Sequence, residues 1–312
     1  MMVSCSSEQT SWIRSLRSSI GRIFRDGGPV TPYWFILPHA ILFILFFLYP
    51  LLQGLYLSAF DVDFLRGTQK FVGFGNYAEL FGDELFWLSL KNTVVFVLES
   101  TPLLLIMGLV IALATNAAIP GRIPIRMSFV APLVVSTSAV SIIWRLILLP
   151  DVGVLNYFLR ALGLRGQAWL NQQGWAMFAI VVMTVWWTVG FNILLFLAGL
   201  QDIPSHLYEA AKIDGASSWD AFWRITLPLL RPTLLFVCIW QVRGSFLVFG
   251  QVFMLTQGGP FNSTRVLLYH LYETAFSYFR LGSGCAMGWV LFVIMMVFSL
   301  IQKRVLEPKH SY

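Results

Sequence analysis

The chain has 312 residues, of which 57% are hydrophobic and only 12% are charged, and its formal net charge is +6. A soluble domain carries about 25% charged residues, so this composition excludes an ordinary soluble fold and indicates a chain solvated by lipid. The basic residues lie between the apolar segments, where membrane proteins keep their anchors. This placement argues against nucleic acid as a partner and for membrane lipid.

Residues 1–33 are predicted to form an N-terminal tail. This segment is polar and contains arginines, and the apolar run that follows it is too long for the core of a signal peptide. We therefore expect the first apolar run to remain in the membrane as an uncleaved anchor.

Six apolar runs are long enough to cross a hydrocarbon core of about 30 Å, which takes about 20 helical residues. They do not alternate polar with apolar residues, as strands of a membrane barrel do. The runs are Trp34–Phe60, Thr93–Ala118, Met127–Leu149, Trp175–Leu200, Thr233–Thr256 and Gly284–Gln302. The sequence thus predicts an all-α polytopic membrane protein with about six transmembrane helices, a membrane domain over residues 34–306 and a C-terminal tail over 307–312.

The distribution of lysine and arginine predicts the orientation. With the N-terminus in the cytoplasm, 12 basic residues fall inside, 7 fall outside, and Arg145 and Arg243 fall within spans, which accounts for all 21. Cytoplasmic loops of membrane proteins carry an excess of basic residues. Both termini are therefore expected in the cytoplasm.

The loop over residues 201–231 is cytoplasmic in this topology and is amphipathic rather than merely polar. Ser205 is expected to cap a first short helix, and Ser217 or Ser218 a second one that carries Trp219, Phe222 and Trp223. Gly215 between them permits a turn, and Pro228 marks the entry to the fifth span.

This loop resembles the EAA loop of binding-protein-dependent ABC importers, whose pattern is E-A-A, three residues, G, nine residues, I-x-L-P. The matching positions are Glu209, Ala210, Ala211, Gly215, Ile225, Leu227 and Pro228. The resemblance implies a type I ABC importer transmembrane domain, in which these residues couple the spans to a cytoplasmic ATPase. It also implies a second permease subunit as heterodimer partner, two ATPase subunits and an external solute-binding protein.

Further segments resemble the carbohydrate branch of this family, the maltose and glycerol-3-phosphate type, and its first permease subunit in particular. They include the segment 32–38 before the first span, Phe71–Tyr77 in the outer loop and Leu255–Pro260 after the fifth span. The resemblance implies import of a sugar or sugar derivative across the inner membrane. The chain lacks the extra N-terminal spans and the large outer domain of the maltose archetype.

Enzymatic motifs are missing from the sequence. None of the five lysines follows a glycine, so there is no P-loop lysine, and ATP hydrolysis is expected in partner subunits. No HExxH, CxxC or G-x-S-x-G pattern is present, so no catalytic residue, metal site or cofactor is predicted. An ion-gradient-driven secondary transporter is the alternative function, although it needs a mid-membrane ion site.

Polar and aromatic residues of the fourth and fifth spans are the candidates for the solute pathway. A sugar ring has apolar faces that stack on aromatic rings and polar edges that form hydrogen bonds, and ionisable groups inside spans are functional candidates. The resemblance to carbohydrate permeases implies a pocket on the same two spans. The predicted pathway residues are Trp187, Thr188, Phe191, Asn192, Gln241, Arg243, Gly244, Ser245 and Val248.

Overall fold

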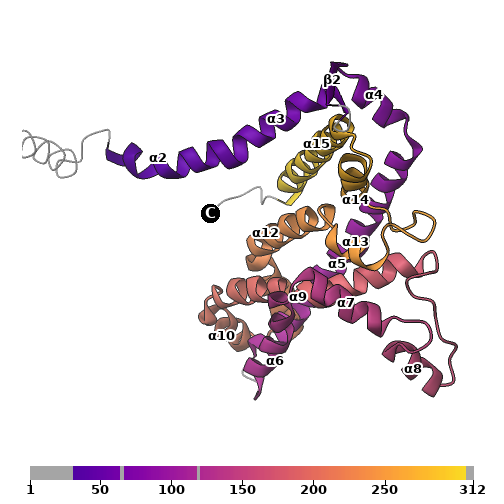
Figure 1. Ribbon diagram of the computed structural model, residues 1–312. Helices are drawn as coiled ribbons and strands as arrows, with labels where there is room; N and C mark the ends of the chain where they lie inside the picture. Colours follow the sequence, from indigo (N-terminus) through magenta and orange to yellow (C-terminus); the bar gives the residue numbers. More distant parts are fainter. Residues whose placement is uncertain (1–30, 64–66, 118–119, 307–312) are drawn as a thin grey trace, which may run out of the picture. The chain divides into compact units, whose positions relative to one another are not determined.

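The computed structural model describes residues 31–63, 67–117 and 120–306, and the chain divides into two units, residues 1–57 and 58–312. The described part of the first unit is one apolar helical stretch (Figure 1). It runs through α2 (Thr31–Phe43), the π-helical η1 (Ile44–Leu48) and α3 (Tyr49–Ser58). Its 26 residues from Tyr33 to Ser58 are long enough to cross a membrane, as the first apolar run predicted.

The second unit opens with a hairpin of β1 (Phe60–Asp63) and β2 (Thr68–Phe71), in which Phe60 pairs with Phe71. The short helix α4 (Gly75–Gly82) follows. The Asn76 side chain donates hydrogen bonds to the carbonyl oxygens of Ser58 and Phe60, at 2.8 and 2.9 Å, and so joins α4 to the hairpin.

Long helices form the body of this unit. They are α5 (Glu84–Asn116), α9 (Trp175–Gln201), α12 (Leu227–Phe246) and α15 (Leu281–Leu306). Helix α9 is the most enclosed, with Ile180, Ile193 and Phe196 fully buried in the main hydrophobic cluster. A helix that is buried on most sides must be apolar around its circumference, which explains why its span has few polar positions.

The third apolar run, Met127–Leu149, does not form one straight helix. This part of the chain consists of α6 (Arg122–Val130), the 3₁₀ turn η2 (Ala131–Val134) and α7 (Thr137–Ile147), with a bend of 106°. Pro132 lacks a backbone N–H, and the Ser136 side chain accepts the N–H of Ala139, so a new helix starts after the bend.

The remaining elements are short helices that connect the spans. They are α8 (Val154–Ala161), α10 (Ser205–Ile213), α11 (Ser218–Ala221), the π-helical η3 (Phe222–Thr226), α13 (Gly250–Leu255), α14 (Leu267–Tyr272) and the π-helical η4 (Glu273–Ser277). Among the described residues, five helices are long and apolar enough to span a membrane, or six if the bent pair is one span. The predicted all-α fold with about six spans is thus confirmed.

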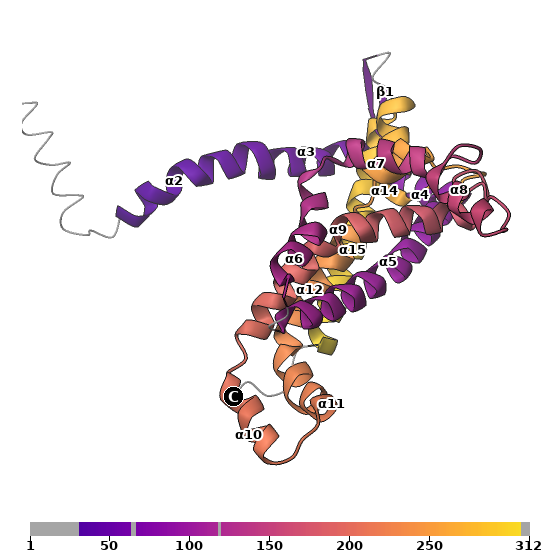
Figure 2. The ribbon, with the colours of Figure 1, turned by 90° about the horizontal axis from the view of Figure 1, so that it is seen from below.

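Two ends of the second unit are clearly distinct. Helices α10 and α11 lie together at one end, while α4 and α14 lie toward the other (Figure 2). The unit therefore presents the Gln201–Arg231 loop away from the loops that flank the start of α5.

Candidate functional site

A cavity of about 410 Å³ lies between α5, α9, the bent third span and the segment where α12 gives way to α13. Its lining comes from α5, η2, α9, α12 and α13. The lining residues are Phe96, Leu133, Thr184, Trp187, Thr188, Phe191, Trp240, Gln241, Gly244, Ser245, Val248 and Gln251. We call it the central pocket.

The interruption between α12 and α13 forms one side of the central pocket. Helix α12 ends at Phe246, and Phe249 has φ −145° and ψ −59° before α13 begins at Gly250. A Cβ at Gly250 would lie 2.7 Å from the Cγ2 of Thr137, so the start of α13 packs closely on the start of α7. Non-helical backbone at membrane depth is tolerated where it is enclosed by protein or lines a cavity, and the break between α12 and α13 meets this condition because its Val248 is buried and lines the pocket.

The chemistry of the central pocket is aromatic and neutral. Four rings line it, and those of Phe191 and Trp240 lie 5.5 Å apart. Five neutral polar residues line it too: Thr184, Thr188, Gln241, Ser245 and Gln251. Rings for stacking beside hydroxyl and amide groups suit a ligand with apolar faces and polar edges.

A chain of polar side chains runs from the pocket wall into the protein behind it and joins three spans. Asn192 donates to the carbonyl oxygen of Leu104 and to Oε1 of Gln241, at 3.3 and 3.4 Å. Gln241 donates to Oγ of Ser245 at 3.4 Å, and Ser245 lies 3.0 Å from the hydroxyl of Ser100. Because Oε1 of Gln241 is engaged by Asn192, the orientation of the Gln241 amide beside the pocket is restrained.

Seven of the nine predicted pathway residues line the central pocket, and Asn192 and Arg243 do not. Asn192 is fully buried and contacts the pocket through Gln241. Arg243 is exposed in the last turn of α12, with its guanidinium carbon 5.6 Å from the centre of the Trp240 ring. A cation there interacts favourably with the C-terminal end of the helix.

Five lining residues are absent from the predicted set: Phe96, Leu133, Thr184, Trp240 and Gln251. Thr184 precedes Thr188 by one helical turn, so its place on the same face of α9 could have been predicted from helical spacing. Phe96 and Leu133 lie on other spans, and only tertiary packing brings them to the pocket.

The Gln201–Arg231 loop contains the two predicted helices. Gly215 has φ +79°, a left-handed conformation that favours glycine, and so makes the predicted turn. Ser217 caps α11 in a capping box with Asp220, as predicted. The predicted cap at Ser205 is wrong, because Pro204 holds the N-cap position and no side chain caps α10 there.

The loop is joined to the spans and also exposes apolar surface. The Tyr208 hydroxyl lies 2.9 Å from that of Thr226, and Leu207 and Ile225 pack against the main hydrophobic cluster. In contrast, Ile213 is 87% exposed and Trp219 is 69% exposed. Exposed apolar residues on short helices that are anchored from behind are typical of a protein interface.

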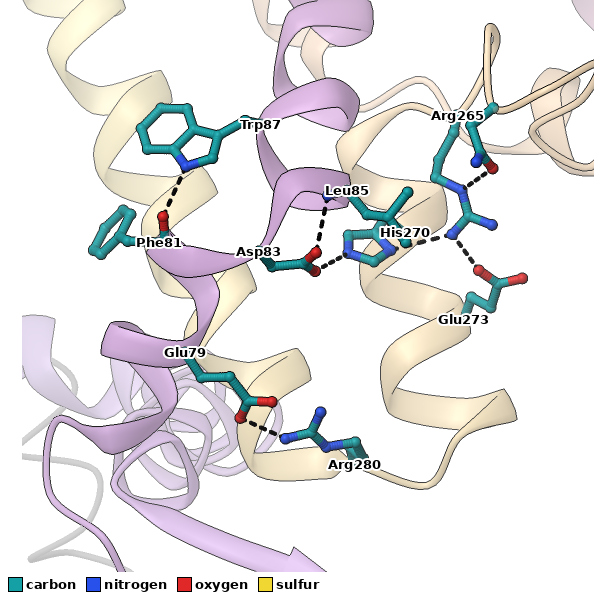
Figure 3. Close-up of polar contacts among 10 residues, drawn as sticks. Glu79, Phe81, Asp83, Leu85, Trp87, Arg265, His270, Glu273 and Arg280 are labelled. Atoms are coloured by element: carbon teal, nitrogen blue, oxygen red, sulfur yellow. Dashed lines mark hydrogen bonds and ion pairs between the residues drawn. The ribbon is translucent and has the colours of Figure 1, made fainter.

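The other end of the second unit holds a cluster of charged residues (Figure 3). Arg265 forms an ion pair with Glu273 and donates to Nδ1 of His270 at 3.2 Å, while Nε2 of His270 lies 3.4 Å from the Asp83 carboxylate. Burial, with the Arg265 charge nearby, lowers the pKa of His270 below its ordinary value. Arg280 pairs with Glu79 at 2.6 Å. The cluster ties α14 and the start of α15 to α4 and α5.

Comparison with known proteins identifies the family. Residues 87–310 match the family described as binding-protein-dependent transport system inner membrane component. The chain is 36% identical to the sulfoquinovosyl glycerol transport system permease protein SmoG of Agrobacterium fabrum, over 87% of this chain and 89% of that protein. It is 35% identical to the lactose transport system permease protein LacF of Rhizobium radiobacter, over 92% and 96%.

The sn-glycerol-3-phosphate transport system permease protein UgpA of Agrobacterium fabrum is 34% identical, over 91% of this chain and 97% of that protein. Among solved structures, a bacterial ABC transporter that imports the acidic polysaccharide alginate has a chain with a TM-score of 0.79 and 24% identity, over 95% of this chain and 100% of that chain. A complex of bacterial alginate ABC transporter with a pentasaccharide-bound periplasmic protein gives a TM-score of 0.77 at 25% identity, over 92% and 97%. The prediction made from the Glu209–Pro228 motif is confirmed: the chain belongs to the inner membrane components of binding-protein-dependent transport systems.

Proposed function

We propose that this chain is a permease subunit of an ABC importer for a sugar or sugar derivative, and that the central pocket is its solute site. The observation that carries the proposal is the position of the pocket at two interrupted spans, lined by aromatic and neutral polar residues. Discontinuous helices commonly form the solute sites of transporters.

The names of the relatives support a carbohydrate solute. They describe transport of sulfoquinovosyl glycerol, glycerol 3-phosphate and lactose, and the solved transporter imports alginate. These solutes share hydroxyl-rich carbon skeletons. The family depends on a binding protein, so the ion-gradient-driven alternative receives no support.

The partners in this proposal are a second permease subunit, two cytoplasmic ATPase subunits and a solute-binding protein. The alginate complex, which includes a periplasmic protein, supports the last of these. The Gln201–Arg231 loop is the contact for an ATPase subunit, since it exposes Ile213 and Trp219 and is anchored to the spans through Tyr208. In this role Glu209, Ala210, Ala211 and Gly215 form the contact and its turn, and Ile225, Leu227 and Pro228 join it to α12.

ATP binding in this mechanism draws the ATPase subunits together and moves the coupling loops with them. Ile225 and the Tyr208–Thr226 contact then transmit the movement to the core around α9 and α12, which form the walls of the central pocket. The pocket consequently opens to the outside, accepts solute from the binding protein and releases it inward after hydrolysis. In this proposal residues 34–306 act as the permease domain, between the tails 1–33 and 307–312.

The orientation places both termini and the Gln201–Arg231 loop in the cytoplasm. Ser217 and Phe261 are both exposed and lie on opposite sides of the membrane in this topology. In a chain whose native cysteines are replaced by serine, Ser217→Cys is expected to react with a membrane-impermeant thiol reagent only after permeabilisation. Phe261→Cys is expected to react in intact spheroplasts, and the reverse pattern contradicts the orientation.

The solute site is tested by uptake into proteoliposomes that contain the whole complex, the binding protein and ATP. Gln241→Leu keeps the size of the side chain but removes its hydrogen bonds, so the KM for solute is expected to rise about tenfold, equivalent to about 1.4 kcal/mol. Gln302→Leu, the same change on α15 outside the pocket, is the control and should leave the KM within about twofold of the wild type. Equal KM values for the two variants contradict the proposed site.

A further inference from the structure

The bend in the third span leaves a backbone carbonyl that the helix does not satisfy. In a continuous helix the carbonyl oxygen of Val135 would accept the N–H of Ala139. Here that N–H is directed to the Ser136 side chain, at 3.3 Å. The indole N–H of Trp187, on α9, donates to the Val135 carbonyl oxygen instead, at 3.2 Å.

The same indole belongs to the central pocket. Trp187 lines it from α9, and Leu133, two residues before Val135, lines it from the bent span. A solute that stacks on Trp187 therefore contacts the group that holds the bend. Any shift of this ring changes its hydrogen bond to Val135, because the bond depends steeply on distance and angle.

Close packing holds both sides of the bend, and η2 within the bend also packs on α9. A Cβ at Gly190 would lie 2.2 Å from the Phe129 carbonyl oxygen, so the end of α6 rests directly on α9. On the other side, Thr137 at the start of α7 rests on Gly250. Between these contacts, the indole of Trp187 is a polar link from α9 to residue 135.

We propose that Trp187 is a positioning residue, which fixes the bend of the third span and transmits solute occupancy of the central pocket to it. The first half of the inference concerns this chain alone. The second half rests on the proposed function, because it requires a solute in the pocket.

The bend is measured by the distance between spin labels at Met127→Cys on α6 and Ile142→Cys on α7, in the complete complex with the native cysteines replaced. Both positions are exposed, at 61% and 54%. Trp187→Phe keeps an aromatic ring and removes the N–H. We expect it to broaden the distance distribution to at least twice its width in the parent. Trp175→Phe is the matched control on the same helix, since Trp175 packs on Trp169 and Phe178 and does not line the pocket, and it should leave the width unchanged.

Uptake separates this role from a general packing role. Trp187→Phe keeps the stacking ring, so the KM is expected to stay within about twofold, while the maximum rate falls about fivefold because the hydrogen bond that holds the bend to α9 is lost. An unchanged distance distribution in Trp187→Phe overturns the proposal. If Trp187→Phe broadens the distance distribution but the parent complex shows no uptake, Trp187 holds the bend. The proposed function is then overturned, together with the transmission that rests on it.

Discussion

Charge reversal at Glu209 is expected to detach the ATPase from the complex. Glu209 is exposed on α10, the helix that Tyr208 anchors to η3, and the apolar Ile213 and Trp219 flank it on the same loop. In the proposed interface a lysine there places a like charge or an unpaired charge at a desolvated contact, which costs about 2–5 kcal/mol. Such a cost weakens attachment by about 30-fold or more.

The measurement is co-purification of the ATPase with Glu209→Lys, together with ATP hydrolysis stimulated by the loaded binding protein. Asp151→Lys reverses an exposed charge beyond the far end of α7 and is the control, which should retain the ATPase. Gly215→Ala should give a smaller defect, because a side chain at φ +79° costs about 1 kcal/mol. If Glu209→Lys retains the ATPase fully and its ATP hydrolysis is stimulated normally, this loop does not couple the spans to the ATPase.

A methyl group at Gly190 is expected to destabilise the second unit. Its Cβ would lie 2.2 Å from the carbonyl oxygen of Phe129 and 2.9 Å from the Cα of Val130. These are backbone atoms, so no side-chain rotation relieves the overlap, and α6 has to move away from α9. Overpacking of this kind costs about 1–3 kcal/mol, and displacement of the bent span also opens the wall of the central pocket.

Gly190→Ala should therefore lower the melting temperature of the purified complex and impair uptake at equal membrane levels. Gly82→Ala is the control, because Gly82 is helical and a Cβ there meets no atom within 4 Å. That variant should be neutral or slightly more stable, since alanine favours helix over glycine by up to about 1 kcal/mol. A Gly190→Ala complex as stable and active as Gly82→Ala would show that α6 does not rest on α9 at this position.

The number of spans could be predicted because a bilayer requires about 20 apolar residues per crossing. The bend at Val135 could not, because apolarity is the same on both sides of it and the cause is local: Pro132 lacks a donor and Ser136 starts a new helix. The end of α12 at Phe246 also lies inside an apolar run, so hydropathy does not mark it.

The site was predictable where it follows a helix face and not where it depends on packing between helices. Trp187, Thr188 and Phe191 share one face of α9, and spacing alone groups them. Asn192, the next residue, points to the polar chain behind the wall. Phe96 and Leu133 reach the pocket only because α5 and the bent span pack against α9.

The position of a bound solute in the assembled complex is the measurement that tests the central claim most directly. A structure determined with solute, the binding protein and the ATPase subunits trapped in the outward-facing state should place the solute in the central pocket. It should stack on Trp187, Phe191 or Trp240 and lie within hydrogen-bonding distance of Gln241. A solute bound elsewhere in the membrane region, with the central pocket free of it, would contradict the claim.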